Sequence, residues 1–361
     1  QLKINFRKMK KTVTLFLGIA LLFASCETDN EDNDSSKTVN QEAFLTNTAD
    51  NIILPAYSEL NTSIAALRTS IDSFAARGTE PKLKEVQSKL KTAYLNWQKV
   101  SHLEFGPAET VGLKSNVNIF PVNEVQIENN ISSGNANLDA LSNKVAKGFP
   151  ALDFLLHEAD DSTLLTKFQQ QNRVDYLQLV VTDLKSKVET VTNEWNSYRA
   201  TFVAAKGTDV GSSTGILVNT LNLHFEKFFR DNKIGIPLGV RSSGIPRPEF
   251  SEALHGSYSV ELALQNLQSM KEMYTGKTGY GLDDYLDASD ANTINTSILA
   301  QFDLIEMRLK ALSDPLPLQI AVNPEAVQLA YNEMQKLIVF IKVDLPSRMG
   351  ILITYQDNDG D

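Results

Sequence analysis

The chain has 361 residues, of which 42% are hydrophobic, and 34 Lys and Arg stand against 44 Asp and Glu for a formal net charge of -10. This length exceeds what one hydrophobic core usually serves, so two units in one body are expected. The acidic balance, with no basic cluster beyond the extreme N-terminus, argues against a nucleic-acid partner. The single cysteine, Cys26, excludes an intramolecular disulfide and leaves oxygen and histidine as the only ligands for a metal in the body.

The N-terminus has the pattern of a lipoprotein signal peptide, predicted over residues 1–26. Two lysines follow Met9, and an apolar run over residues 13–23 is too short to span a bilayer as a mature helix. Small residues then precede Cys26, as a signal peptidase requires before a lipidated cysteine. We therefore predict lipidation at Cys26 and a start at Met9, with residues 1–8 upstream of it. The alternative is an ordinary cleavage site beside an incidental cysteine.

An acidic, polar segment follows the cysteine and predicts a disordered tether over residues 27–40. Residues 27–36 contain no apolar side chain that could join a core. The segment also resembles the acidic export signal in surface lipoproteins of Bacteroidetes-type bacteria, which would place the body outside the cell. A solvated spacer that leaves the body in the periplasm is the alternative. Either way we expect an outer membrane lipoprotein.

The body is predicted to be all-α, with negligible sheet. Apolar residues recur every three to four positions over residues 42–75, 83–100, 174–198, 217–228, 260–270, 298–309 and 327–341. Pro55 should kink the first of these helices. Residues 105–147, rich in Asn and Ser, favour irregular backbone or short helical turns. No alternating segment of useful length is present, so a sheet is not expected.

A glycine-rich polar stretch, residues 206–215, is the best internal boundary because nothing in it could be buried. We predict an N-terminal helical bundle over residues 41–205, a linker over 206–215 and a C-terminal helical bundle over 216–361. Each half supplies about four helical segments, which is enough for a bundle-like core.

Several acidic and histidine side chains could carry chemistry. Glu104 continues the apolar stripe of the 83–100 helix and would need a partner there, unless it is exposed at a fraying helix end. Asp153 and His157 are four residues apart on a predicted helix, a spacing that suits one cation or a mutual hydrogen bond; a solvated pair at a helix end is the alternative.

A second group follows the glycine-rich stretch. Glu252 and His255 are three residues apart and could coordinate jointly on a helix, or could belong to a turn that caps the next helix. His224 shares a face with apolar residues and is interpreted as a core or interface histidine with one hydrogen bond.

Several segments occur in a distinctive order and spacing: Ile53-Leu54-Pro55 with Tyr57, Trp97, Glu104-Phe105-Gly106-Pro107, Phe120-Pro121, the segment from Gly148, Lys233-Ile234-Gly235-Ile236-Pro237-Leu238-Gly239, the stretch 249–259, and Asp357-Asn358-Asp359-Gly360-Asp361. Together they resemble the imelysin family, whose members are exported, helical and often lipid-anchored. The resemblance covers essentially the whole mature body. It implies a polar site where the two halves meet, with the 249–259 stretch facing it, and a link to iron acquisition.

The chain departs from the family's motif, Gly-x-His-x-x-Glu, which has been proposed as a metal site and interpreted as a metallopeptidase signature. Gly148 is kept, but Pro150 stands at the histidine position and Asp153 at the glutamate position. Proline has no ligating atom, so this half of a metal site is lost unless His157 substitutes. Zinc hydrolysis generally needs three protein ligands, and no His-Glu-x-x-His run is present, so a peptidase is disfavoured.

We therefore expect a non-catalytic lipoprotein that binds a ligand or metal between two helical bundles. Candidate ligands to a metal, with iron or another hard cation preferred over zinc, are Glu104, Asp153, His157, Glu252 and His255. Loss of the motif histidine could instead reflect a different ligand, such as a peptide or glycan. The alternatives are an exported metallopeptidase and a surface protein that docks a transporter or receptor.

Overall fold

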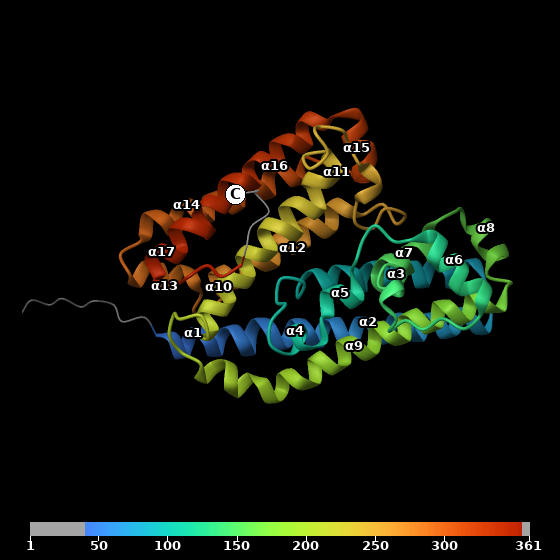
Figure 1. Ribbon diagram of the computed structural model, residues 1–361, viewed down its shortest axis with the longest axis horizontal. Helices are drawn as coiled ribbons and strands as arrows, with labels where there is room; N and C mark the ends of the chain where they lie inside the picture. Colours follow the sequence, from blue (N-terminus) through green and yellow to red (C-terminus); the bar gives the residue numbers. More distant parts are fainter. Residues whose placement is uncertain (1–39, 356–361) are drawn as a thin grey trace, which may run out of the picture. The chain divides into compact units, whose positions relative to one another are not determined.

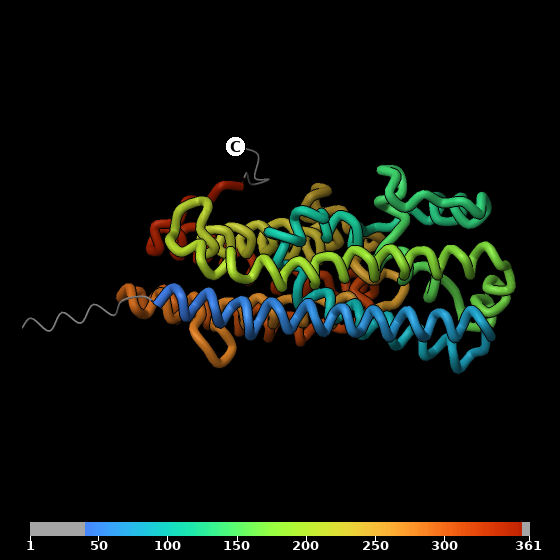
Figure 2. Tube along the Cα trace, turned by 90° about the horizontal axis from the view of Figure 1, so that it is seen from below, coloured from blue at the N-terminus to red at the C-terminus, as the bar shows by residue number. Residues whose placement is uncertain are grey.

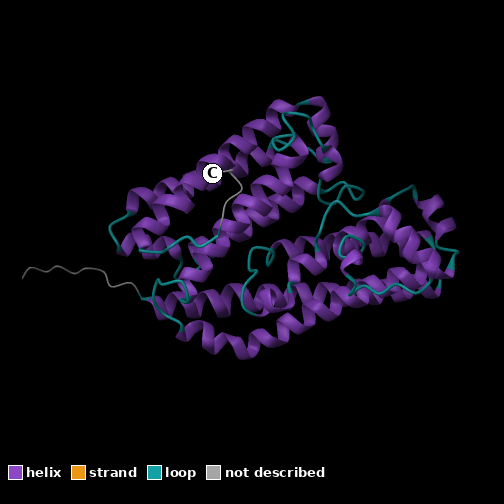
Figure 3. Cartoon of the chain, viewed as in Figure 1, coloured by secondary structure: helices purple, strands orange, loops and turns teal. Residues whose placement is uncertain are grey.

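The computed structural model describes residues 40–355 (Figure 1). The predicted signal peptide, Cys26, the tether up to residue 39 and the acidic segment 357–361 lie outside the described residues. Within the described part all regular structure is helical and no strand is present, which confirms the all-α prediction (Figure 3). None of these helices has both the length and the apolarity needed to cross a bilayer.

The long helices up to the glycine-rich stretch coincide with the apolar repeats of the sequence, and shorter helices lie between them. They are α1 (Gln41–Asn47), η1 (Thr48–Ile53), α2 (Leu54–Ala76), α3 (Glu80–Gln98), α4 (Pro107–Val111), α5 (Leu113–Val117), α6 (Glu124–Ser133), η2 (Leu141–Asn143), α7 (Gly148–His157), α8 (Asp161–Lys167) and α9 (Gln171–Ala204). The short helices α4 to α6 occupy the region where the sequence favoured short helical turns.

The helices after that stretch follow the same pattern. They are α10 (Ser213–Leu223), η3 (His224–Gly235), α11 (Ile236–Leu238), η4 (Pro248–Phe250), α12 (Ser259–Thr275), α13 (Leu282–Ala288), α14 (Asn292–Lys310), α15 (Leu316–Val322), α16 (Pro324–Val339), η5 (Phe340–Asp344) and α17 (Leu345–Met349).

Long helices form the core of each half. In the N-terminal half α2 packs against both α3 and α9, and Figure 2 shows α2 and α9 running side by side. The buried aromatic side chains there include Tyr57, Trp97 and Trp195. In the C-terminal half α14 packs between α12 and α16. Burial of such stripes of large apolar side chains is the main favourable term in folding.

The two halves are joined by contacts between α3 and α12. At the end of α3, the carbonyl of Gln98 accepts hydrogen bonds from Asn266 (2.9 Å) and Ser269 (3.0 Å), and all of these side chains are buried. By its contacts the described chain belongs to one compact unit. The loop between α9 and α10 overlaps the predicted linker, but α10 begins at Ser213, and Ser212, Ser213 and Thr214 are buried, so the expectation that nothing in this stretch could be buried is wrong. The division of the body into two domains there stays a prediction.

Three π-helical segments of the described chain each end two residues before a proline. η1, η3 and η5 precede Pro55, Pro237 and Pro346, and in each the residue before the proline donates its N–H to the carbonyl five residues earlier. A proline ring crowds the carbonyl four residues before it, so a wider turn accommodates it. Where the sequence predicted a kink at Pro55, the structure has such a turn.

Candidate ligand-binding site

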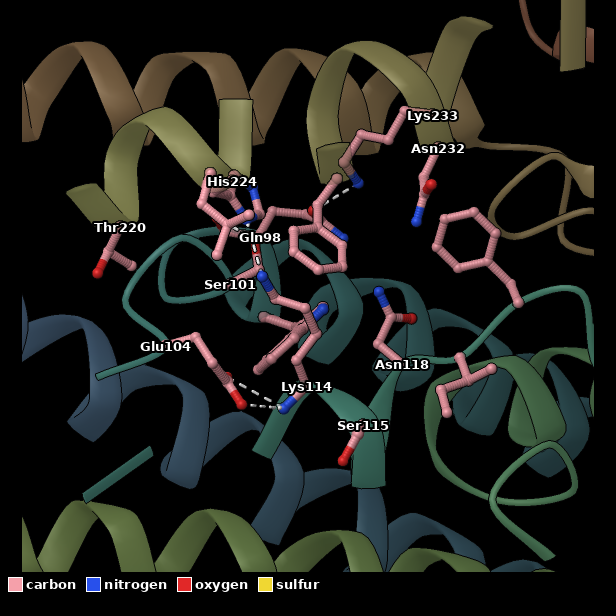
Figure 4. A pocket seen from close by; sticks show the side chains of 15 residues that line it. Gln98, Ser101, Glu104, Lys114, Ser115, Asn118, Thr220, His224, Asn232 and Lys233 are labelled. Carbon is pink, nitrogen blue, oxygen red and sulfur yellow. Dashed lines mark hydrogen bonds between the residues drawn. The ribbon is translucent and has the colours of Figure 1, made fainter. Parts of the chain in front are cut away.

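A cavity of about 400 Å³ lies between the end of α3, α5 and the α10–η3 helix (Figure 4). It therefore takes side chains from both halves of the sequence. Its lining consists of Trp97, Gln98, Ser101, Glu104, Lys114, Ser115, Asn118, Ile119, Phe120, Thr220, Leu223, His224, Phe228, Asn232 and Lys233. Ser115 is exposed to solvent, so the cavity reaches the surface. Of the five predicted site residues, only Glu104 lines it.

Glu104 reaches the cavity from a connection and not from a helix. Because α3 ends at Gln98, the helical spacing used to place Glu104 on an apolar stripe is wrong. The chain turns at Gly106, whose φ is +55°, and α4 then begins at Pro107. A Cβ on Gly106 would lie 2.6 Å from the ring of Tyr198, so this turn needs glycine.

The Glu104 carboxylate accepts the backbone N–H of Lys114 with both oxygens, each at 3.1 Å. Burial raises the pKa of Glu104, and the nearby Lys114 ammonium partly opposes that rise. Burial lowers the pKa of Lys114 to about 7, with Glu104 opposing the fall. Lys114 therefore titrates close to neutral pH.

The Lys114 side chain extends away from Glu104 toward the C-terminal half (Figure 4). Its Nζ lies 3.1 Å from Nδ1 of His224 and 3.6 Å from the centroid of the Phe228 ring. Among the described residues, no carboxylate forms an ion pair with this ammonium. The amine is thus held by an imidazole and an aromatic face, without an anionic partner.

Two buried histidines lie against this amine. The rings of His102 and His224 are 6.0 Å apart, and His224 also contacts Asn266 through Nε2 at 2.8 Å. The interpretation of His224 as a core or interface histidine is confirmed. Burial lowers the pKa of His102 to about 3 and that of His224 below its usual range, with Lys114 adding to both effects. Both rings are therefore neutral at physiological pH.

His102 was missed in the sequence. Neither of its ring nitrogens has a hydrogen-bond partner among the described residues, and its side chain is almost wholly buried. The apolar periodicity ends before it, so no spacing marked it.

Glu252 lies beside the cavity in a buried ion pair with Lys233. Its carboxylate also accepts hydrogen bonds from Gln98 (3.0 Å) and Asn118 (2.8 Å), and the Lys233 ammonium donates to Gln98 at 2.8 Å. Burial lowers the pKa of Lys233, and Glu252 opposes that shift. This arrangement leaves both charges matched inside the protein.

Asp153 is buried in α7 and holds the loop that follows η4. Its carboxylate accepts the backbone N–H groups of His255 (3.0 Å) and Gly256 (2.9 Å). His157 lies one turn later, with Nδ1 3.4 Å from the carboxylate and 3.2 Å from the carbonyl of Asp153. The i and i+4 pair thus meets as the sequence suggested. A Cβ on Gly256 would lie 2.5 Å from the carboxylate, so glycine permits this approach.

A second, smaller cavity of about 210 Å³ contains Pro150, Asp153 and His255. Nε2 of His255 lies 3.4 Å from the Glu124 carboxylate. Residues 252–257 form turns and no helix, so Glu252 and His255 do not share a helical face: Glu252 faces Lys233 and His255 faces Glu124. The joint coordination considered for them is not formed.

Comparison with known proteins bears on this geometry. The family model described as "Peptidase_M75: Imelysin" matches residues 53–339. The chain belongs to the imelysin family. An iron-regulated protein A precursor from Parabacteroides distasonis ATCC 8503 has a similar structure, with TM-score 0.72 and 16% identity over 86% of this chain and 95% of that one. An imelysin-like protein from Psychrobacter arcticum 273-4 has TM-score 0.70 and 16% identity over 89% and 98%. At this identity they show the imelysin fold alone. Comparison with curated proteins gives no match.

The imelysin motif positions have separate structural roles in this chain. Gly148 has φ +73°, and a Cβ there would lie 2.2 Å from the carbonyl oxygen of Val117. Glycine is therefore required for α7 to begin against the end of α5. Pro150 lies in the first turn of α7 and puts an apolar ring into the smaller cavity.

The residues of the motif do not fit a metal. Pro150 offers no donor atom, and both Asp153 oxygens already accept protein N–H groups. Across residues 40–355 no group of three or more His, Cys, Asp or Glu side chains is arranged to hold a metal ion. A catalytic zinc site generally takes three protein ligands.

Proposed function

We propose that this imelysin-family chain is an exported, lipid-anchored binding protein that holds a small organic ligand in the 400 Å³ cavity, in the service of iron acquisition. The cavity itself carries the proposal. Ligand sites are typically concave, mostly apolar and 300–1,000 Å³ in volume, with a few polar groups that orient the ligand. Here Trp97, Phe120 and Phe228 supply the apolar surface, while Lys114 and Asn232 supply polar groups.

Binding, and not hydrolysis, is what the polar side chains support. Asp153 and Glu252 are occupied by donors from the protein, so neither is free to activate a water or to bind a metal without breaking buried hydrogen bonds. Loss of such bonds leaves buried polar groups unpaired, which is costly. A metal-free ligand is therefore favoured over a bare cation.

Anchoring and the iron link rest on other observations. The sequence up to Cys26 has the pattern of a lipoprotein signal peptide, which supports attachment to the outer membrane, at the cell surface or its periplasmic face. A tethered binding protein would deliver its ligand to a transporter or receptor in the same membrane. The structural neighbour from Parabacteroides distasonis is described as iron-regulated, which supports an iron-related role.

Growth of a deletion strain in iron-poor medium tests this function without knowledge of the ligand. Thr220 lines the cavity, and its side chain makes no hydrogen bond to another described residue, so Thr220→Trp should fill the space. Thr69 is exposed on α2, so Thr69→Trp is the matched control. We expect the wild type and Thr69→Trp to restore growth, and Thr220→Trp and Cys26→Ala to fail. Full growth with a folded Thr220→Trp protein would overturn the proposal.

Elemental analysis tests the metal-free character of the site. After equilibration with an iron salt and extensive dialysis, the purified protein should retain well under one iron per chain. Stoichiometric iron that disappears in Asp153→Ala and His157→Ala would instead establish a metal site at α7.

A further inference from the structure

We propose that the ligand is a small organic carboxylate with an apolar body, and that the Lys114 ammonium is its counter-ion. This inference rests on the proposed function, since it names the chemical class that the same cavity takes. It depends on the charges around the cavity, on which of them are already matched and on the apolar character of the remaining lining.

Two lysine side chains line the cavity, and among the described residues only one of them has an anionic partner. Lys233 pairs with Glu252, and both side chains are nearly inaccessible to solvent. Lys114 contacts the neutral ring of His224 and the face of Phe228, and none of the described carboxylates pairs with its ammonium. Burial without an anionic partner lowers the pKa of this amine to about 7, and an anion supplied from outside the protein would stabilise its protonated form.

The carboxylate of Glu104 lines the cavity but does not serve as the anionic partner of Lys114. Both carboxylate oxygens of Glu104 accept the backbone N–H of Lys114, while the Lys114 side chain extends away from this carboxylate (Figure 4). An anion entering from the Ser115 side could therefore approach Nζ without displacing an existing ion pair. A charge-assisted hydrogen bond to a carboxylate is roughly twice as strong as a neutral one.

The rest of the lining favours an apolar body over a bare inorganic anion. Trp97, Ile119, Phe120 and Leu223 surround the space next to Lys114. Asn232 also lines it, and among the described residues its amide has no hydrogen-bond partner, so it can orient a second polar group of the ligand. A ring or branched chain would bury its surface against these side chains.

Calorimetric titration with three shape-matched compounds tests the inference. The probes are 3-phenylpropanoate, its primary amide and 3-phenylpropylamine, titrated into the full anchored chain in lipid nanodiscs, with empty nanodiscs as the blank. We expect the carboxylate to bind about tenfold more tightly than the amide, since one charge-assisted hydrogen bond distinguishes them. The amine should bind most weakly.

Variants at Lys114 assign the preference to its charge. Lys114→Met should abolish the preference by weakening carboxylate binding far more than amide binding, whereas Lys114→Arg should retain the preference. Lys185→Met, which replaces a partly exposed lysine of α9 that pairs with Glu189, is the control and should behave as the wild type. The near-ultraviolet circular dichroism of each variant establishes that it is folded; if Lys114→Met is not folded, Lys114→Gln takes its place.

The outcomes separate this inference from the proposed function. Equal binding of amide and carboxylate, or tighter binding of the amine, would overturn the carboxylate assignment while the cavity remained a binding site. Carboxylate binding that persists in Thr220→Trp would place the probe elsewhere and also overturn it. Failure of all three probes to bind would overturn the assignment too, and growth of the Thr220→Trp strain would still decide the proposed function.

Discussion

Lys233 in η3 and Glu252 in the turn after η4 form a buried ion pair beside the end of α3. Their side chains are 5% and 1% exposed. Gln98 lies between them, donating to the carboxylate and accepting from the ammonium. Gln98, Lys233 and Glu252 therefore satisfy one another beside the cavity, and removing any one of them would leave a buried polar group without its partner.

Removing one member of this pair should destabilise the protein strongly. Lys233→Met leaves the Glu252 charge buried, and we expect a loss of about 3–5 kcal/mol in the free energy of unfolding, measured by urea denaturation. Lys310 pairs with Glu306 at an exposed site, so Lys310→Met should change stability by less than about 0.5 kcal/mol. Equal effects of the two variants would show that the buried pair contributes no more than a surface one.

Asp153→Ala should release the loop over residues 252–257. Two backbone N–H groups would lose their charged acceptor, which corresponds to about 2–4 kcal/mol. Hydrogen exchange should accelerate at the amides of His255 and Gly256. Asp160→Ala removes an exposed cap of α8, so its effect should remain within that helix. An unchanged exchange rate in the loop would contradict the role given to Asp153.

Gly148→Ala should be far more damaging than the same change at another glycine with positive φ. Its Cβ would overlap the Val117 carbonyl, which belongs to backbone and cannot move aside, so we expect a loss above about 4 kcal/mol. Gly244 has φ +81° but open space around it, so Gly244→Ala should carry only the left-handed strain of about 1–2 kcal/mol. Thermal unfolding of both variants measures the difference.

Lys114 should make stability depend on pH above neutrality. Its folded-state pKa is about 7 and its ordinary value is 10.5, so between these values the unfolded chain binds the extra proton. Stability should therefore rise with pH across this window, by at most about 1.4 kcal/mol per pH unit from this group.

Lys114→Met should remove that slope, and urea denaturation across the same window measures it. The other ionisable groups facing Lys114 are Glu104, His102, His224 and Lys233, and both histidines titrate below the window. Burial also lowers the pKa of Lys233, so a smaller slope remains in Lys114→Met, and the difference between wild type and variant is the measure. Lys185→Met should keep the wild-type slope. A slope in Lys114→Met equal to that of the wild type would assign the pH dependence to another group.

The helices could be predicted from the sequence because their apolar residues recur at helical spacing and end up buried. The stripe that ends at Trp97 and Val100 is an example, since both side chains are fully covered. The position of Glu104 could not be predicted in this way, because α3 stops at Gln98 and the following turns carry no period.

The residues that line the cavity could not be predicted from the sequence, for a different reason. Lys114 and His224 are 110 residues apart in the sequence. Lys233 lies in η3, whereas its partner Glu252 lies in a turn that has no periodic pattern. A lysine is ordinarily a surface residue, so nothing local distinguished Lys114 or Lys233. The contact of Asp153 with its loop, 102 residues away, likewise depends on packing between elements.

The close fit of Gly148 against Val117 bears on how signatures of this family are used. Gly148 is needed for space, whereas Pro150 occupies a position where the motif has a potential metal ligand, so the two motif positions serve different physical ends. A pattern search that counts matching letters would give both positions the same weight. Weighting each position by what it touches would separate the requirement for the fold from the requirement for a ligand.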